Sequence, residues 1–318
     1  MKLNNKLARD QIVEIANDWH SERKVDHLKQ DRLKKRFIES VDKSEYVREL
    51  IISPMMLNVL MRCSRYEELP KYRLPLYRLC VQFMVCDWDI ERLLENTANK
   101  DRLLDSEDKE EILQTVAAEM KPYTNDSGFT QQGIVEYELQ SIIEYKLNRL
   151  GFCNPKKTAD SMIEKLFYFQ DHLLSHTGEA FYVFAHQRFF EYFYATYFVD
   201  LFKHKEEIDF EYLKKEIFGK HWCDVSWHGT LVLIVAGIHR KFALKIIEYL
   251  MAQSGESRDF VNVFLAAECF IQMQAHKFRE STTAATILCD NLKALSNPKF
   301  YPDTIWRRAS LLLYELKW

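Results

Sequence analysis

Glycine and proline are scarce in this sequence of 318 residues, which contains 8 and 7 of them. A fold of many short strands and tight turns needs more of both. A disordered chain would carry far fewer than the 47% hydrophobic and 14% aromatic residues present here. The composition therefore indicates a helix-rich globular protein, long enough to form two or three domains and to bury a real core.

A strong net charge is also missing, since 47 acidic and 44 basic residues give a formal charge of −3. No global field therefore recruits nucleic acid or an anionic membrane. The basic run Arg32-Leu33-Lys34-Lys35-Arg36 lies among acidic residues and is typical of a solvated helix face.

The sequence has neither a CxxC pair nor a long apolar run. Its cysteines are odd in number and widely spaced, which predicts buried thiols in a reducing compartment; they lie at positions 63, 80, 86, 153, 223, 269 and 289. The longest purely apolar run, residues 231–236, is far too short to cross a bilayer. Met1 leads directly into charged sequence, without the pattern of a signal peptide. We therefore expect a cytoplasmic protein.

Apolar residues recur at helical spacing over residues 1–104, where we expect a first helical domain. Ser53-Pro54 is a favourable helix start, because serine caps well and proline suits the first helical position. Polar composition over residues 95–111 marks a candidate boundary. The expected helices cover residues 9–19, 33–41, 46–52, 54–61 and 76–94.

Residues 105–190 resemble a winged-helix module, in which helices are followed by a short β-hairpin. We expect helices over 112–120, 130–150 and 161–170, and then strands over 173–176 and 180–184 around the turn residues Thr177-Gly178-Glu179. Residues 191–318 are helical throughout and predict a second, solenoid-like helical domain, although they match no named repeat. The expected fold class is therefore mainly α with one small β element.

The segment from Phe181 to Ala195 is the most informative part of the chain. Its aromatic and β-branched start predicts a strand, and the pattern changes to a helical period directly after His186. Free backbone N–H groups and the helix dipole favour an anion at such a junction. The sequence thus places an ionisable imidazole where a phosphate would be stabilised.

Four segments, in this order and spacing, resemble NACHT-type NTPases, a branch of the STAND signalling ATPases. Their similarity covers roughly residues 10–240, with a weaker fifth segment formed by Trp222 and residues 231–237. The four segments are Leu50-Ile51-Ile52-Ser53-Pro54-Met55-Met56-Leu57, Leu69-Pro70-Lys71-Tyr72-Arg73-Leu74-Pro75-Leu76-Tyr77, Trp88-Asp89-Ile90-Glu91-Arg92 and the run from Phe184 to Ala195.

The resemblance implies a nucleotide-binding α/β domain followed by a helical domain, a winged helix and a second helical domain. This sequence has no GxxxxGK[ST] loop and no apolar strand that ends in paired acidic residues. Without a phosphate-cradling loop and a Mg²⁺ site, we expect no ATPase activity from this chain alone. ADP or ATP would bind only together with an NTPase domain, supplied in cis or in trans.

By resemblance, two residues contact the nucleotide. His186 would contact the β-phosphate of ADP and hold the resting state, and Pro54 would pack near the adenine. The alternatives are a core histidine satisfied by a backbone carbonyl and a simple helix start. Arg188 and Glu191 follow the histidine, and for Glu191 a stabilising interaction with the helix dipole is more plausible than catalysis.

No arrangement predicts a catalytic centre or a metal site. Asp171, His172 and His176 have suitable ligand types, but the predicted strand separates the two histidines. A second group has ragged spacing and consists of His221, Cys223, Asp224 and His228.

The resemblance implies the regulatory portion of a signalling ATPase that couples recognition of a protein trigger to nucleotide exchange and self-association, in innate immunity or antiphage defence. Two alternatives remain open. A helical scaffold would bind a protein partner without any nucleotide. A winged-helix nucleic-acid binder is disfavoured by the near-neutral charge and by the acidic segment 135–144, where a recognition helix would lie.

Overall fold

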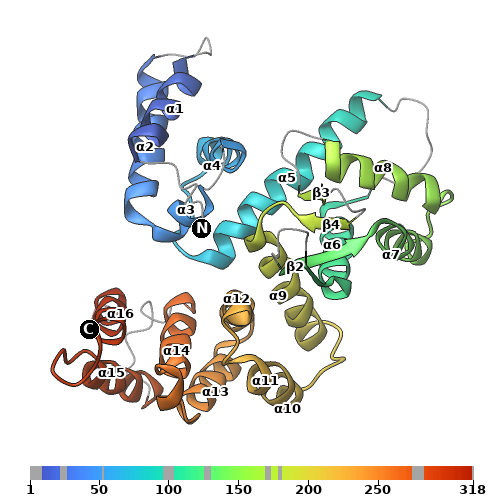
Figure 1. Ribbon diagram of the computed structural model, residues 1–318. Coiled ribbons are helices and arrows are strands. Elements are labelled where there is room, and N and C mark those ends of the chain that lie inside the picture. The colour runs from blue at the N-terminus through green and yellow to red at the C-terminus, as the bar shows by residue number, and fades with distance from the viewer. Residues whose placement is uncertain are drawn as a thin grey trace. The chain divides into compact units, whose positions relative to one another are not determined.

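The structure is a computed structural model that describes residues 9–21, 27–51, 54–95, 104–124, 130–168, 173–177, 181–273 and 283–316. The chain forms two compact units, residues 1–190 and 191–318. Figure 1 shows that both are built mainly from helices and that one small antiparallel sheet lies in the first unit.

The first unit begins with five helices: α1 (Arg9–Ser21), α2 (His27–Lys43), α3 (Glu45–Leu50), α4 (Pro54–Tyr66) and α5 (Arg73–Glu95). They confirm the expected helical start of the chain. α5 begins three residues earlier than predicted, so Pro75 lies in its first turn, where a missing N–H costs nothing. The core between α2, α4 and α5 is fully buried and includes Phe37, Leu57, Leu60, Tyr77 and Val81.

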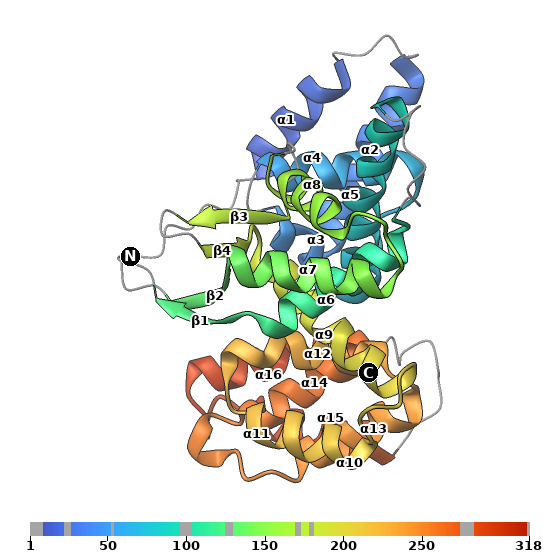
Figure 2. The ribbon, with the colours of Figure 1, turned by 90° about the vertical axis from the view of Figure 1, so that its right-hand side faces the viewer.

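The sheet follows, and α7 and α8 pack against its strands. The elements in chain order are α6 (Ser106–Glu119), β1 (Lys121–Thr124), β2 (Thr130–Val135), α7 (Glu136–Arg149), α8 (Pro155–Tyr168), β3 (Leu174–Thr177) and β4 (Phe181–Phe184). The strands pair antiparallel in the order β1-β2-β4-β3. Figure 2 shows these strands with α7 and α8 beside them.

The predicted helix over residues 130–150 is wrong in its first six residues, which form β2. The sequence Thr-Gln-Gln-Gly-Ile-Val has no apolar helical stripe, and its β-branched end pairs with β4, Ile134 opposite Tyr182. Gly133 is opposite Lys121 of β1, and the Tyr123 ring lies beside it: a Cβ at Gly133 would be 3.5 Å from Cδ1 of Tyr123. The sheet therefore has four strands instead of the single expected hairpin.

The expected hairpin itself is confirmed. β3 pairs with β4 in antiparallel register, with Leu174 opposite Phe184 and Thr177 opposite Phe181. Of the predicted turn, Gly178 and Glu179 lie outside the described residues. The preceding helix, α8, begins at Pro155, six residues before the predicted start, because this proline occupies the first helical position.

The second unit contains only helical elements among its described residues. α9 (Gln187–Lys203) leads into it and is followed by α10 (Phe210–Tyr212), a π-helical turn at Leu213–Phe218, α11 (Gly219–His221) and a 3-10 turn at Val225–Trp227. The later helices are α12 (His228–Gly237), α13 (Arg240–Met251), α14 (Val261–Gln272), α15 (Thr283–Leu295) and α16 (Asp303–Leu316), with a short 3-10 turn at Glu256–Arg258 before α14.

α12 and α14 form the centre of this unit. Nearly every residue of both helices is buried, and α14 packs on α12, α13, α15 and α16. None of the described helices is both long and apolar enough to cross a membrane.

Candidate functional site

The strand-to-helix junction predicted around His186 is present. β4 ends at Phe184 and α9 begins at Gln187, so two residues connect them. β4 is an inner strand between β2 and β3, and the Ala185 N–H donates to the Leu173 carbonyl at 2.9 Å, which extends the strand pairing by one residue. The sheet therefore fixes the backbone up to the residue before His186.

The imidazole of His186 caps the helix that follows it. Nδ1 accepts a hydrogen bond of 3.0 Å from the backbone N–H of Arg188, the second residue of α9. An accepting Nδ1 carries no proton, so the proton of the neutral ring lies on Nε2. Burial, and then the positive charge of Arg188, lowers the pKa of His186 from 6.5 to about 4. The ring is thus a neutral N–H donor at pH 7.

That donor has no acceptor. The side chain is only 9% exposed, and Nε2 is buried without a hydrogen-bond partner among the described residues. A buried donor without a partner costs roughly 1–3 kcal/mol. The expected alternative, a core histidine satisfied by a backbone carbonyl, does not describe this ring. Nε2 is covered in this chain, and its contact with a nucleotide remains an expectation.

A second histidine shows what capping alone requires. His239 precedes α13, and its Nδ1 accepts a hydrogen bond of 3.3 Å from the backbone N–H of Lys241. As for His186, the donor is the backbone of the residue two positions later in the chain. The side chain of His239 is exposed, so its Nε2 is free to bond water. Capping therefore explains the Nδ1 contact of His186 but not the burial of its Nε2.

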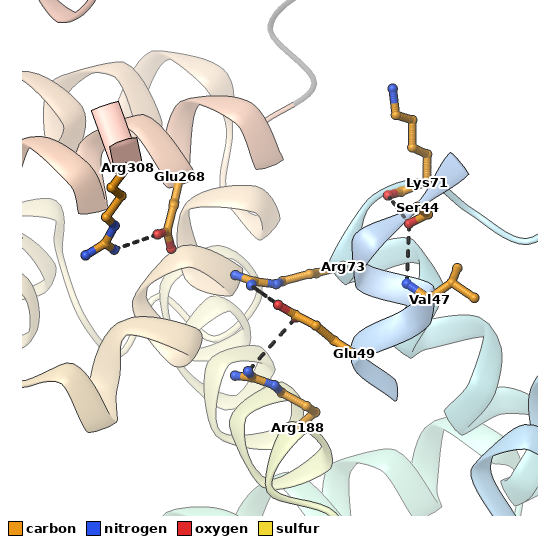
Figure 3. Close-up of polar contacts among 8 residues, drawn as sticks. All are labelled: Ser44, Val47, Glu49, Lys71, Arg73, Arg188, Glu268 and Arg308. Carbon is orange, nitrogen blue, oxygen red and sulfur yellow. Dashed lines mark hydrogen bonds and ion pairs between the residues drawn. The ribbon is translucent and has the colours of Figure 1, made fainter. Parts of the chain in front are cut away.

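A charged cluster lies next to this junction, within the first unit. Glu49 and Tyr46 share one face of α3, and the Arg73 guanidinium lies against both. Nη2 of Arg73 is 3.2 and 3.4 Å from the two Glu49 carboxylate oxygens, and Cζ is 4.6 Å from the centre of the Tyr46 ring. Figure 3 shows Glu49 extending from α3 toward this guanidinium.

Arg188 approaches the same carboxylate from another element. Its Nη2 is 4.0 Å from Oε2 of Glu49, so two guanidinium groups share one carboxylate (Figure 3). α3 is itself held at its start: the Ser44 hydroxyl accepts from the Val47 N–H at 3.3 Å and donates to the Lys71 carbonyl at 3.2 Å. α3, the start of α5 and the start of α9 therefore meet at Glu49.

Pro54 opens α4, as expected, but its side chain and the residues before it, Ile52 and Ser53, lie outside the described residues. Its contact with an adenine remains an expectation. Glu191 is 5% exposed and lies against the first turn of α12, where a Cβ at Gly229 would overlap its carboxylate. Its charge therefore faces the positive end of α12 and not that of its own helix. Two aromatic side chains near it on α9, Phe189 and Phe193, are fully buried.

The candidate metal ligands are engaged elsewhere where they are described. Asp224 accepts from Ser226, Nε2 of His228 is 2.9 Å from the Trp222 carbonyl oxygen, and the His221 ring stacks on Trp227 at 3.7 Å. Asp171, His172 and the His176 side chain lie outside the described residues. Within the part of the chain that is described, no group of three or more His, Cys, Asp or Glu residues is placed to hold a metal ion. The described cysteines are free thiols, although Cys153 is exposed, contrary to the expectation of burial.

Sequence reasoning did not identify Glu49 and Arg73 as part of the site. A signal was present: Arg73 is the arginine of the second resembling segment, Arg188 lies in the fourth, and Glu49 directly precedes the first. Comparisons with protein-family models, with curated proteins and with solved structures found no match for this chain.

Proposed function

We propose that this chain is the regulatory and sensor portion of a NACHT-type signalling ATPase. In the resting state it would help to retain ADP, and recognition of a trigger would be coupled to nucleotide exchange and self-association, as in innate immune or antiphage defence. The observation that carries this proposal is the Nε2–H of His186, a buried donor at a strand-to-helix junction for which the described part of the chain provides no acceptor. A phosphate oxygen is an acceptor that would satisfy it.

The order of elements in residues 106–184 supports the winged-helix part of the proposal. A helix and a strand (α6, β2) precede two helices (α7, α8) and a hairpin (β3, β4), and β2 pairs with the second strand of that hairpin. β1 is an addition at the edge. In this arrangement His186 follows the last strand of the module and begins the helix that leads out of it.

The burial of Nε2 determines how the switch would operate. Because the atom is covered in this chain, a phosphate reaches it only when the covering groups move. Nucleotide contact and junction conformation are therefore coupled. The nucleotide itself requires an NTPase domain in cis or in trans, since the phosphate-binding loop is not in this sequence. A conformational coupling of this kind is what a two-state regulatory element needs.

The test supplies the NTPase domain in cis, loads ADP, and compares the parent with His186→Asn. Asparagine retains a capping oxygen but lacks the Nε2 donor. We expect ADP to dissociate roughly ten- to a hundredfold faster, as for the loss of a hydrogen bond to a charged group, and the protein to oligomerise without its trigger. His239→Asn is the matched control and should leave both properties unchanged. Equal ADP dissociation in the parent and the His186 variant would refute the proposal.

A helical protein-interaction scaffold is the second candidate. Large apolar side chains are exposed on the last two described helices and the loop between them: Ile287, Phe300, Leu311 and Tyr314. Such residues are common in surfaces that bind protein partners. This candidate requires no role for ADP, so it would be favoured if the His186 variant retained ADP like the parent.

A further inference from the structure

Glu49 occupies a central place in the first unit. Its side chain is 19% exposed, and its carboxylate lies between the guanidinium groups of Arg73 and Arg188. A carboxylate removed from water in this way is stabilised by its cationic partners, and the two guanidiniums repel one another unless the carboxylate lies between them. Glu49 therefore helps to hold the Arg188 side chain in place.

Arg188 in turn controls the His186 ring. Its backbone N–H donates to Nδ1 at 3.0 Å, and this bond fixes both the orientation of the imidazole and the tautomer that protonates Nε2. The contacts are continuous: Glu49 on α3 holds the Arg188 side chain, and the Arg188 backbone holds His186. α3 lies directly before the start of α4 at Pro54.

We propose that Glu49 is a positioning residue for His186, which it holds through Arg188 so that Nδ1 remains the acceptor and Nε2 keeps the proton that a ligand would accept. For the identity of that ligand the inference rests on the proposed function. The coupling itself is a property of this chain and is measurable without nucleotide. The coupling also connects the two candidate nucleotide-contacting residues, because α3 lies directly before Pro54 and the junction carries His186.

Loss of the Glu49 charge would loosen this arrangement. Glu49→Gln removes the charged acceptor that Arg73 and Arg188 share, so the Arg188 side chain loses this ion pair. The first turn of α9 then no longer presents its N–H to Nδ1 in a fixed geometry. The imidazole is free to exchange between its two neutral tautomers.

The experiment records nitrogen-15 NMR spectra of the histidine side chains in the full chain at pH 7, with His186 assigned from the His186→Asn spectrum. The parent should show His186 as the Nε2–H tautomer alone. Glu49→Gln and Arg188→Gln, which break the same contact from opposite sides, should each show a mixture of both tautomers. Glu39→Gln, which removes the exposed Glu39–Lys43 pair on α2, is the matched control and should resemble the parent.

The pathway is tested by combining the two substitutions. If Glu49 acts through Arg188, Glu49→Gln should have no further effect on the tautomer ratio in an Arg188→Gln background. A pure Nε2–H tautomer in folded Glu49→Gln, or in Arg188→Gln, would overturn the inference. Because Arg188 is about one-third exposed, its substitution keeps the test decisive even if Glu49→Gln fails to fold.

Nucleotide retention separates this inference from the function on which it rests. With the NTPase domain supplied, Glu49→Gln should accelerate ADP dissociation by about threefold to tenfold, less than His186→Asn. Unchanged ADP dissociation in His186→Asn, together with mixed tautomers in Glu49→Gln, would reject the nucleotide role and retain the coupling. Accelerated ADP dissociation in His186→Asn, together with a parent-like tautomer in Glu49→Gln, would retain the nucleotide role and reject the coupling.

Discussion

The backbone N–H of Arg188 points at Nδ1 of His186 from 3.0 Å, so the ring that ends the strand segment also begins the helix. One nitrogen of the imidazole thereby caps the helix, and the other, Nε2, is buried and has no hydrogen-bond partner in the described ranges. The same residue thus has a structural task and an unused hydrogen-bond donor. Substitutions that retain a capping acceptor and remove the Nε2 donor separate these two properties.

Capping is the first property to test. His186→Asn retains a side-chain oxygen for the Arg188 N–H, whereas His186→Ala does not, so the alanine variant should be less stable by about 1 kcal/mol. Urea denaturation measures this difference. His239→Asn and His239→Ala should differ by a similar amount, because His239 caps α13 in the same way. Equal stabilities of the two His186 variants, with a difference at position 239, would mean that His186 is not a cap.

Acid should destabilise the protein through His186. The pKa of this residue is about 4 when folded and 6.5 as its ordinary value, so the unfolded chain binds the extra proton between these two pH values. Stability contributed by the neutral ring is complete above pH 6.5 and is lost as the pH falls toward 4, by about 3 kcal/mol in total.

The measurement compares urea denaturation at pH 7.5 and pH 4.5 in the parent and in His186→Asn. Between these two pH values the parent should lose about 2.5 kcal/mol more stability than the variant. His221 and His228, whose pKa values burial also lowers, are present in both proteins and cancel in the difference. Parallel pH profiles would show that the ring is not buried as described.

The sequence was sufficient to predict the junction because its signals are local. A β-branched and aromatic run followed by a helical period predicts a strand and then a helix, and β4 and α9 lie there. The β3–β4 hairpin followed from its turn residues in the same way. The helical character expected for residues 191–318 is also found in every described element of the second unit, since apolar stripes at helical spacing are a strong pattern.

The parts that were missed depend on distant partners. β2 is short and polar, and it becomes a strand because β1 and β4 pair with it on its two sides. Glu49 looks like any surface glutamate on a short helix. Its role is visible only when Arg73, 24 residues away, and Arg188, much further along the chain, converge on it. No periodicity in the sequence predicts contacts between residues so far apart in the chain.

The contact between Glu191 and Gly229 predicts an unusual response to alanine. A Gly→Ala change inside a helix normally stabilises by about 1 kcal/mol. At position 229 the added methyl group would overlap the buried Glu191 carboxylate, so Gly229→Ala should instead destabilise the second unit by about 1–3 kcal/mol. Thermal or urea unfolding provides the measurement.

Gly219→Ala is the matched control for this change. The nearest atom to a Cβ at position 219 is the hydroxyl oxygen at the end of the flexible Tyr249 side chain, which can move aside. This variant should be within about 0.5 kcal/mol of the parent or more stable. If both alanine variants were equally tolerated, the Glu191 carboxylate would not be held against α12.

The ion pair between Arg308 and Glu268 joins α16 to α14, as Figure 3 shows. Nη2 of Arg308 is 2.8 Å from Oε1 of Glu268, and the guanidinium carbon is 4.6 Å from the centre of the Phe264 ring.

Arg308→Met retains the apolar stem but removes the charge, and should lower stability by about 1 kcal/mol, since an accessible ion pair and a cation–π contact are each worth less than this. Arg308→Lys should recover about half, because an ammonium still pairs with Glu268 but does not stack as a plane. Arg307→Met is the control on the same helix: its ion-pair partner Asp303 is exposed, and the Trp306 ring that it approaches at 5.4 Å is also on α16, so this change should cost less, about 0.5 kcal/mol or below. Equal losses in the two methionine variants would show that the contact between the helices contributes no more than an ordinary surface pair, and that α16 is held on α14 by its apolar side chains alone.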